Sequence, residues 1–198
     1  MIIYRYKDDD EYRQEQYKAN EEKENRVWFR EKDLIFIDEM IPFPDVKSVL
    51  CHGTRNGAEL ELFQSYYPDA RVLGTEIAPT ATKYNNTIRH DFRKPHHKLT
   101  GKFDIVFSNS LDHSNDPKST LKVWRDQLNR RGIMFIEVKV DQTSVRPNNG
   151  ARLSDPLEWE YEGEFKDLAR SMGFKVHSRQ LDTFQAEQLI TILYMLEQ

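Results

Sequence analysis

Residues 46–62 read VKSVLCHGTRNGAELEL and contain three patterns in succession. Apolar positions from Val46 to Leu50 predict a strand, and glycines bound a short turn at 53–57. Apolar residues at helical spacing begin at Leu60. A strand, a glycine turn and a helix in this order point backbone N–H groups and a helix N-terminus at the polar end of a ligand. Glycine suits such a turn because it tolerates positive φ and close backbone approach.

The composition predicts one soluble α/β domain. The 198 residues are 38% hydrophobic and 31% charged, enough to bury a core. No apolar run approaches the roughly 20 residues of a membrane helix, and residues 1–12 turn acidic without a signal-peptide core, so we expect a cytoplasmic protein. The single cysteine, Cys51, excludes an intrachain disulfide and a CxxC metal site. A net charge of −4 makes nucleic acid an unlikely partner.

The N-terminal part of the chain is dense in charge. In residues 1–7 apolar and polar side chains alternate weakly, which predicts a short strand. Residues 8–33 carry Glu and Lys at helical spacing, which predicts one or two solvated helices. We expect residues 1–41 to form a charged helical extension and residues 42–198 to form a Rossmann-like domain. Whether the extension is an accessory tail or a lid over the site stays open at this point.

The rest of the chain alternates between apolar strands and amphipathic helices. The expected strands are 46–51, 71–76, 87–90, 103–108, 133–138, 174–181 and 188–196, and the expected helices are 57–67, 117–129 and 164–172. Between them, residues 139–158 are polar and contain proline and glycine, which predicts a long loop.

Glu76 ends the expected strand 71–76, about 20 residues after Gly57. Dinucleotide-binding folds place a carboxylate at this spacing, where its two oxygens accept hydrogen bonds from the ribose hydroxyls. The alternative is an ordinary surface glutamate at a strand end, and the spacing favours the ribose role.

The order of these motifs resembles the class I S-adenosylmethionine-dependent methyltransferases of the small-molecule type, from residue 46 to the C-terminus. Residues 49–57 (VLCHGTRNG) look like the family's first motif, an acid followed by GxGxG. Residues 109–117 (NSLDHSNDP) look like its LEHxxDP segment, and residues 128–134 (LNRRGIM) match its entry to the fifth strand. The resemblance implies a doubly wound, mostly parallel seven-stranded sheet with the last strand antiparallel and helices on both faces.

The resemblance also implies a set of residues for the cofactor, S-adenosyl-L-methionine. Glu76 matches the ribose-binding acid, and 90–92 match the residues that hold the adenine. The full expected set is Gly53, Thr54, Arg55, Asn56, Gly57, Glu76, Ile77, His90, Asp91, Phe92, Asn109, Ser110 and Leu111. His113 follows the fourth strand and is the candidate base for transfer to O or N, with Asp112 orienting its ring; the alternative is a histidine that only orders the loop.

Two residues depart from the family pattern at the methionine end of the expected cofactor. Cys51 stands where the family has Asp or Glu, and Arg55 stands at its middle glycine. Arginine can form a bidentate pair with a carboxylate, so one hypothesis is that Arg55 binds the methionyl carboxylate. The other is that Arg55 fills the pocket and the protein no longer uses this cofactor.

Other functions stay open beside transfer to a small molecule. One is a methyltransferase-fold protein that binds a nucleoside or partner without catalysis. Another is RNA 2′-O-methylation, because Lys139 resembles that family's lysine, although Asn109 replaces its Asp. A nicotinamide-dependent oxidoreductase is weaker, since residues 53–58 (GTRNGA) lack the middle glycine of GxGxxG. The basic residues in 89–102 are interpreted as a solvated face of the protein. The adjacent His96 and His97 have no apparent third ligand, so no metal site is expected.

Overall fold

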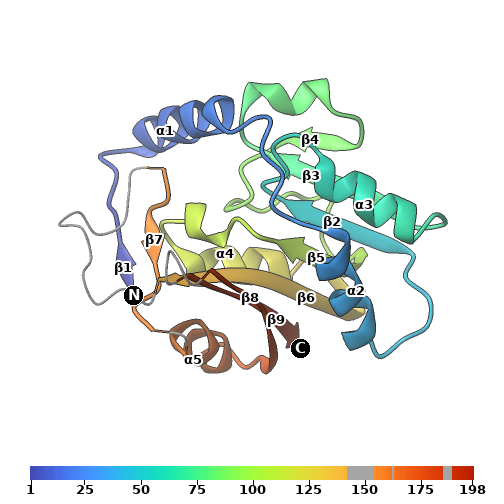
Figure 1. Cartoon of the computed structure of the whole chain (residues 1–198). Coiled ribbons are helices and arrows are strands. Elements are labelled where there is room, and N and C mark those ends of the chain that lie inside the picture. The colour runs from blue at the N-terminus through green and yellow to red at the C-terminus, as the bar shows by residue number, and fades with distance from the viewer. Residues whose placement is uncertain (142–153, 162, 185–188) are drawn as a thin grey trace.

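A seven-stranded sheet forms the middle layer of this computed structural model, which describes residues 1–141, 154–161, 163–184 and 189–198 (Figure 1). Its strand order is β4-β3-β2-β5-β6-β9-β8. The strands are β2 (Ser48–His52), β3 (Arg71–Glu76), β4 (Thr87–Arg89), β5 (Phe103–Ser108), β6 (Leu128–Asp141), β8 (Lys175–Phe184) and β9 (Leu189–Glu197). Strands β2 to β6 pair in parallel, and β9 runs antiparallel to both of its neighbours. The predicted doubly wound sheet with an antiparallel last strand is confirmed.

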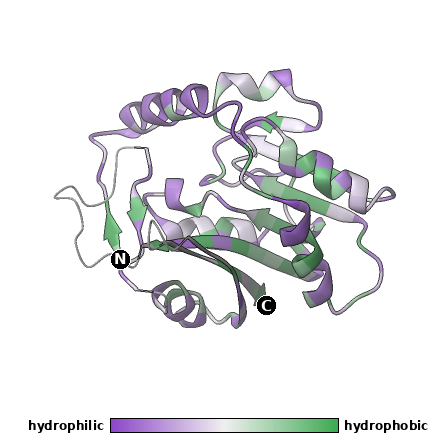
Figure 2. Cartoon of the chain, viewed as in Figure 1, coloured by the Kyte–Doolittle hydropathy of each residue, from purple (hydrophilic) through white to green (hydrophobic). Residues whose placement is uncertain are grey.

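Helices cover both faces of the sheet, because its central strands are apolar on both sides. All six residues of β5 are buried; Ile105 faces α2 (Glu31–Met40) and α3 (Ala58–Tyr66), and Val106 faces α4 (Pro117–Arg125) and α5 (Glu164–Ser171). Figure 2 shows the hydrophobic strands between more hydrophilic helices. Short 3₁₀ helices, η1 (Pro79–Lys83) and η2 (Leu111–His113), follow β3 and β5 at the carboxyl edge of the sheet. Among the described residues, no helix is long and apolar enough to cross a membrane.

The N-terminal segment contains β1 (Ile2–Ile3) and α1 (Asp9–Glu22), followed by α2. Strand β1 pairs with β7 (Leu157–Glu158) in a separate two-stranded sheet. Helix α1 is strongly hydrophilic and lies across the carboxyl edge of the main sheet (Figures 1 and 2). Helix α2 instead packs Leu34 and Ile37 into the core on the face of the sheet that α3 also covers. The division of the chain at residue 41 therefore stays a prediction.

The predicted helix 117–129 is too long, and the predicted strand 133–138 is too short. Helix α4 ends at Arg125, and β6 begins at Leu128. The reason is tertiary: Lys102 and Phe103 donate their backbone N–H groups to the carbonyl of Gln127, at 2.9 and 3.1 Å, which starts the pairing with β5. The predicted loop 139–158 is also partly wrong, since 139–141 continue β6 and β7 lies within it; its middle, 142–153, lies outside the described residues.

Candidate functional site

A cavity of about 40 Å³ lies at the carboxyl edge of the sheet, under α1. The sheet side of its lining comes from Gly53, Arg55, Glu76, Ile77, Phe92, Ser110 and His113, all of them residues that the sequence predicted for the site. The helix side comes from Tyr12, Gln16, Ala19, Asn20 and Lys23, which the sequence did not indicate. These α1 residues recur at helical spacing, and this stripe is the signal that could have shown a covered face.

The glycine turn is anchored to β3 and packed against the loop after β5. Gly53 and Thr54 donate backbone N–H groups to the carbonyl of Thr75, at 2.9 and 3.2 Å. Gly53 has φ +72°, and a Cβ atom there would lie 2.6 Å from Cβ of Ser110. Only glycine fits this position, because a side chain would be strained and would clash.

Glu76 is buried at the end of β3, and two backbone groups fix its carboxylate. Its Oε2 accepts the N–H of Arg55 at 2.8 Å, and its Oε1 accepts the N–H of Ala78 at 2.9 Å. A carboxylate oxygen has two lone pairs, so each oxygen retains acceptor capacity for a hydroxyl group in the cavity. Glu76 is thus held in position to accept two hydrogen bonds from a vicinal diol.

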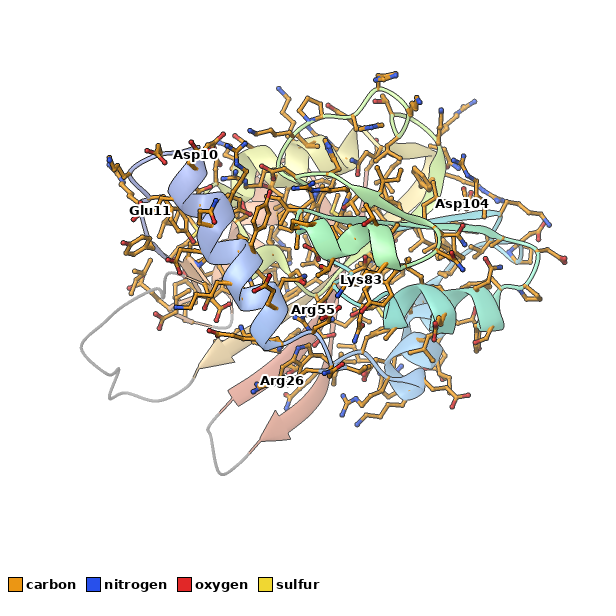
Figure 3. All side chains as sticks on the ribbon, turned by 90° about the horizontal axis from the view of Figure 1, so that it is seen from above. Asp10, Glu11, Arg26, Arg55, Lys83 and Asp104 are labelled. Carbon is orange, nitrogen blue, oxygen red and sulfur yellow. The ribbon has the colours of Figure 1, made fainter. Side chains whose placement is uncertain are left out.

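The glycine turn also binds the segment that leads from α1 to α2. Arg55 donates from Nη1 to the carbonyl of Arg26 at 3.2 Å, and Asn56 donates from Nδ2 to the carbonyl of Glu24 at 2.8 Å. Figure 3 shows Arg55 and Arg26 close together beside α1. The Arg55 guanidinium therefore turns toward the covering segment at the rim of the cavity.

His113 brings together two loops that are distant in sequence. Its Nδ1 lies 2.8 Å from the carbonyl oxygen of Ser154, which can only accept, so the proton sits on Nδ1 and Nε2 keeps a lone pair. Its Nε2 lies 4.0 Å from Oδ1 of Asp112, and its Nδ1 lies 3.6 Å from Oδ1 of Asp155. These three side chains could hold a metal ion, although the Nζ of Lys23 already lies 3.6 Å from Asp155.

The remaining predicted residues do not line the cavity. Asp91 forms an ion pair with Arg93 at 2.8 Å, and His90 contacts the carbonyl of Lys94 at 2.8 Å. The full set is Thr54, Asn56, Gly57, His90, Asp91, Asn109, Leu111 and Asp112. Their roles in cofactor binding or catalysis stay predictions.

Tyr12 lines the cavity from the side of α1. Its side chain is only 1% exposed, and the guanidinium carbon of Arg93 lies 3.4 Å from the centre of its ring. Burial raises the pKa of Tyr12 far above its usual range, and its hydroxyl interacts electrostatically with Arg93, Asp91 and Glu76. Gln16 fixes the helix further by donating to the carbonyl of Ser154 at 3.0 Å.

The lining fits a nucleoside cofactor in its chemistry and not in its present volume. Pockets for such ligands enclose about 300–1,000 Å³. The cavity is far smaller than this because side chains of α1 occupy it. Entry of a nucleoside therefore requires α1 to move away from Glu76.

The fold of this chain is shared with solved structures of low sequence identity. Burkholderia thailandensis 1,6-didemethyltoxoflavin-N1-methyltransferase, solved with 1,6-didemethyltoxoflavin and S-adenosylhomocysteine, superposes with a TM-score of 0.67 at 14% identity, over 98% of this chain and 92% of that chain. This chain has the fold of the class I S-adenosylmethionine-dependent methyltransferases. No protein-family model and no curated protein matches its sequence.

Two further structures show how broadly this methyltransferase fold is used. The CMeT domain of citrinin polyketide synthase superposes with a TM-score of 0.59 at 13% identity. The match covers 90% of this chain and 55% of that chain. The 4+2 cyclase SpnF superposes with a TM-score of 0.63 at 11% identity, over 84% of this chain and 79% of that chain. A cyclase on this fold means that function has to be argued from the site.

Proposed function

We propose that the protein binds S-adenosyl-L-methionine and transfers its methyl group to an O or N atom of a small molecule. The observation that carries the proposal is the carboxylate of Glu76, buried beside the glycine turn and fixed by the N–H groups of Arg55 and Ala78. It offers two acceptors to the ribose diol, whereas an ordinary surface glutamate would be solvated and mobile.

Other lining residues fit the remaining parts of the cofactor. Phe92 and Ile77 offer apolar contacts to the adenine, and the Arg55 guanidinium is at the rim where it can turn to the methionyl carboxylate. S-adenosylmethionine supplies an electrophilic methyl group when it is bound. These residues hold and orient it, so that an acceptor can approach in line.

His113 is the proposed proton acceptor in this reaction. Its Nδ1–H is committed to the carbonyl of Ser154, so Nε2 is the nitrogen that can take a proton from an acceptor hydroxyl or amine. The Oδ1 of Asp112 lies 4.0 Å from Nε2, where the carboxylate can orient the ring. Helix α1 would have to move away from the site for the cofactor to enter, and closing again over the bound cofactor it would keep water away during transfer.

The proposal is tested by calorimetry with S-adenosylhomocysteine, adenosine and a nicotinamide dinucleotide. We expect the first two to bind and the third not to bind. Glu76→Ala should weaken both ligands by about 1–3 kcal/mol, because it removes the acceptor of the ribose hydroxyls. Glu61→Ala, an exposed glutamate on α3, is the matched control and should leave binding unchanged. Wild-type protein that binds neither nucleoside would refute the proposal.

A further inference from the structure

Glu59 is a buried carboxyl group on the first turn of α3, directly behind the glycine turn. Its side chain is 7% exposed. Its Oε1 accepts a hydrogen bond from Nδ2 of Asn109 at 3.4 Å, and its Oε2 has no hydrogen-bond partner among the described residues. Buried polar atoms usually have a hydrogen-bond partner, so an unpaired buried acceptor can indicate the binding site of a ligand group.

The neighbours of Glu59 belong to the proposed cofactor site. Burial raises the pKa of Glu59 above its usual range, and Glu76 adds to the rise. The backbone N–H of Glu59 itself, the charge of Arg55 and the hydrogen bond from Asn109 oppose it. The pKa of the buried Cys51 thiol is raised mainly by burial, and the nearby carboxylate of Glu59 raises it further. Glu59 therefore lies among the glycine turn, the end of β2 and the loop after β5.

This position corresponds to the amino-acid end of the proposed cofactor. Along the carboxyl edge the strands follow the order β3-β2-β5, and Glu76 on β3 takes the ribose in the proposed function. In the proposed function, a ligand that extends from Glu76 across the turn after β2 would approach Arg55, which lines the cavity, and then Glu59 and Asn109, which lie behind that lining. Its amino-acid end is zwitterionic, so it needs a cationic and an anionic partner there.

The end of β2 supplies no anion. Cys51 is a fully buried thiol whose pKa is raised by burial, and burial lowers the pKa of the neighbouring His52 to about 3, so both are neutral at physiological pH. A carboxylate for the ligand's ammonium group has to come from another element, and Glu59 is the buried one at the turn with a free acceptor atom.

We infer that Glu59 binds the ammonium group of the cofactor's amino-acid end, while Arg55 binds its carboxylate. The inference rests on the proposed function and adds a residue to it. An ammonium group would pair with Oε2 and offset the cost of ionising a buried carboxyl group. Binding of the full ligand then favours the ionised form of Glu59 over its protonated form, and a ligand without the amino-acid end does not.

The test compares S-adenosylhomocysteine with 5′-methylthioadenosine, which has the same nucleoside and no amino-acid end. By calorimetry near neutral pH, Glu59→Gln should weaken the first by about 10- to 100-fold, as expected for a lost hydrogen bond to a charged group, and leave the second unchanged. The matched control is Glu137→Gln, which alters another carboxyl group with a free, buried Oε2 and should change neither affinity.

A second measurement does not depend on the variant. Titrations of wild-type protein at decreasing pH, in buffers with different ionisation enthalpies, should show proton release with S-adenosylhomocysteine that grows as Glu59 becomes protonated, and none with 5′-methylthioadenosine. Equal loss of both ligands in Glu59→Gln, or equal proton release with both in the wild type, would overturn the role of Glu59 and leave the proposed function intact. If the wild type binds neither ligand, both the inference and the proposed function fail.

Discussion

At the scale of single residues, the buried carboxyl groups near the carboxyl edge differ in how they are satisfied. Both oxygens of Glu76 accept backbone N–H groups, whereas Glu59 and Glu137 each keep one oxygen without a hydrogen-bond partner among the described residues. Burial raises the pKa of Glu137 to about 7; Lys139 opposes this rise and Asp33 adds to it. Glu137 is thus protonated over a range in which an exposed glutamate is ionised.

This raised pKa predicts a pH dependence of stability. The folded state holds the Glu137 proton more tightly than the unfolded state, so its contribution is fully present below about pH 4.5 and is lost as pH rises through about 7. Glu137→Gln lacks this loss, and its stability relative to wild type should rise by about 2–3 kcal/mol across that interval. Urea unfolding at several pH values measures the difference. A constant gap between the two proteins would show that Glu137 has an ordinary pKa in the fold.

At the scale of elements, α1 and α2 are held in different ways. Helix α1 is fixed largely by polar contacts, among them ion pairs of Asp9 with Arg93 and Lys94, and such exposed pairs stabilise little. The segment before α2 instead buries Phe29, whose ring lies 5.5 Å from that of Phe63 and 4.5 Å from that of Phe107. We therefore expect α1 to open more easily than the rest of the fold.

Deletion of residues 1–23 tests the role of α1 as a cover. Because Phe29 is kept, the domain should fold, and adenosine should associate faster since Tyr12 no longer fills the cavity. Stopped-flow fluorescence measures the association rate. An unchanged rate would contradict the prediction.

A cut at Leu34 is the informative control for this deletion. It also removes Phe29 and should cost about 3–5 kcal/mol of stability, as for loss of a buried aromatic side chain. Unfolding by urea separates this loss of core packing from a change in access to the site.

At the scale of the whole molecule, His52 connects several layers. Its Nδ1 lies 2.7 Å from Oγ1 of Thr75 on β3, and its Nε2 lies 2.7 Å from Oε1 of Gln127 before β6. Its ring stacks on Trp124 of α4 at 4.7 Å. Burial lowers its pKa to about 3, while the hydrogen bond to Gln127 opposes that shift, so this junction is built for a neutral imidazole.

The contribution of His52 to stability should therefore decrease when the protein is acidified. The unfolded state binds a proton at His52 below about pH 6.5, and the folded state does so only near pH 3. The free energy of unfolding therefore decreases as the pH is lowered from about 6.5 to about 3. This one group contributes about 1.4 kcal/mol per pH unit. His52→Gln should be less stable near neutral pH and should show a shallower fall on acidification. Parallel curves for the two proteins, measured by thermal unfolding, would refute this account.

Strands β3 and β5 and the position of Glu76 follow from the amino-acid sequence alone. Strand β3 occupies the predicted residues Arg71–Glu76, and β5 the predicted Phe103–Ser108, because alternation and apolar runs are local properties that the sheet preserves. Glu76 follows directly, since the end of a parallel strand lies at the carboxyl edge. Gly53 and Arg55 of the glycine turn after β2 line the cavity, and their role in binding stays a prediction.

The cover over the carboxyl edge and the end of α4 depend instead on contacts between distant parts of the chain. The charge pattern of α1 indicates solvent, yet Tyr12 is buried because Arg93, 81 residues further along, places its guanidinium over the ring. Helix α4 ends early because the backbone N–H groups of Lys102 and Phe103, at the start of β5, donate hydrogen bonds to the carbonyl of Gln127. Periodicity reports which face of an element is apolar; the partner of a polar group is set by contacts between residues that are far apart in the chain.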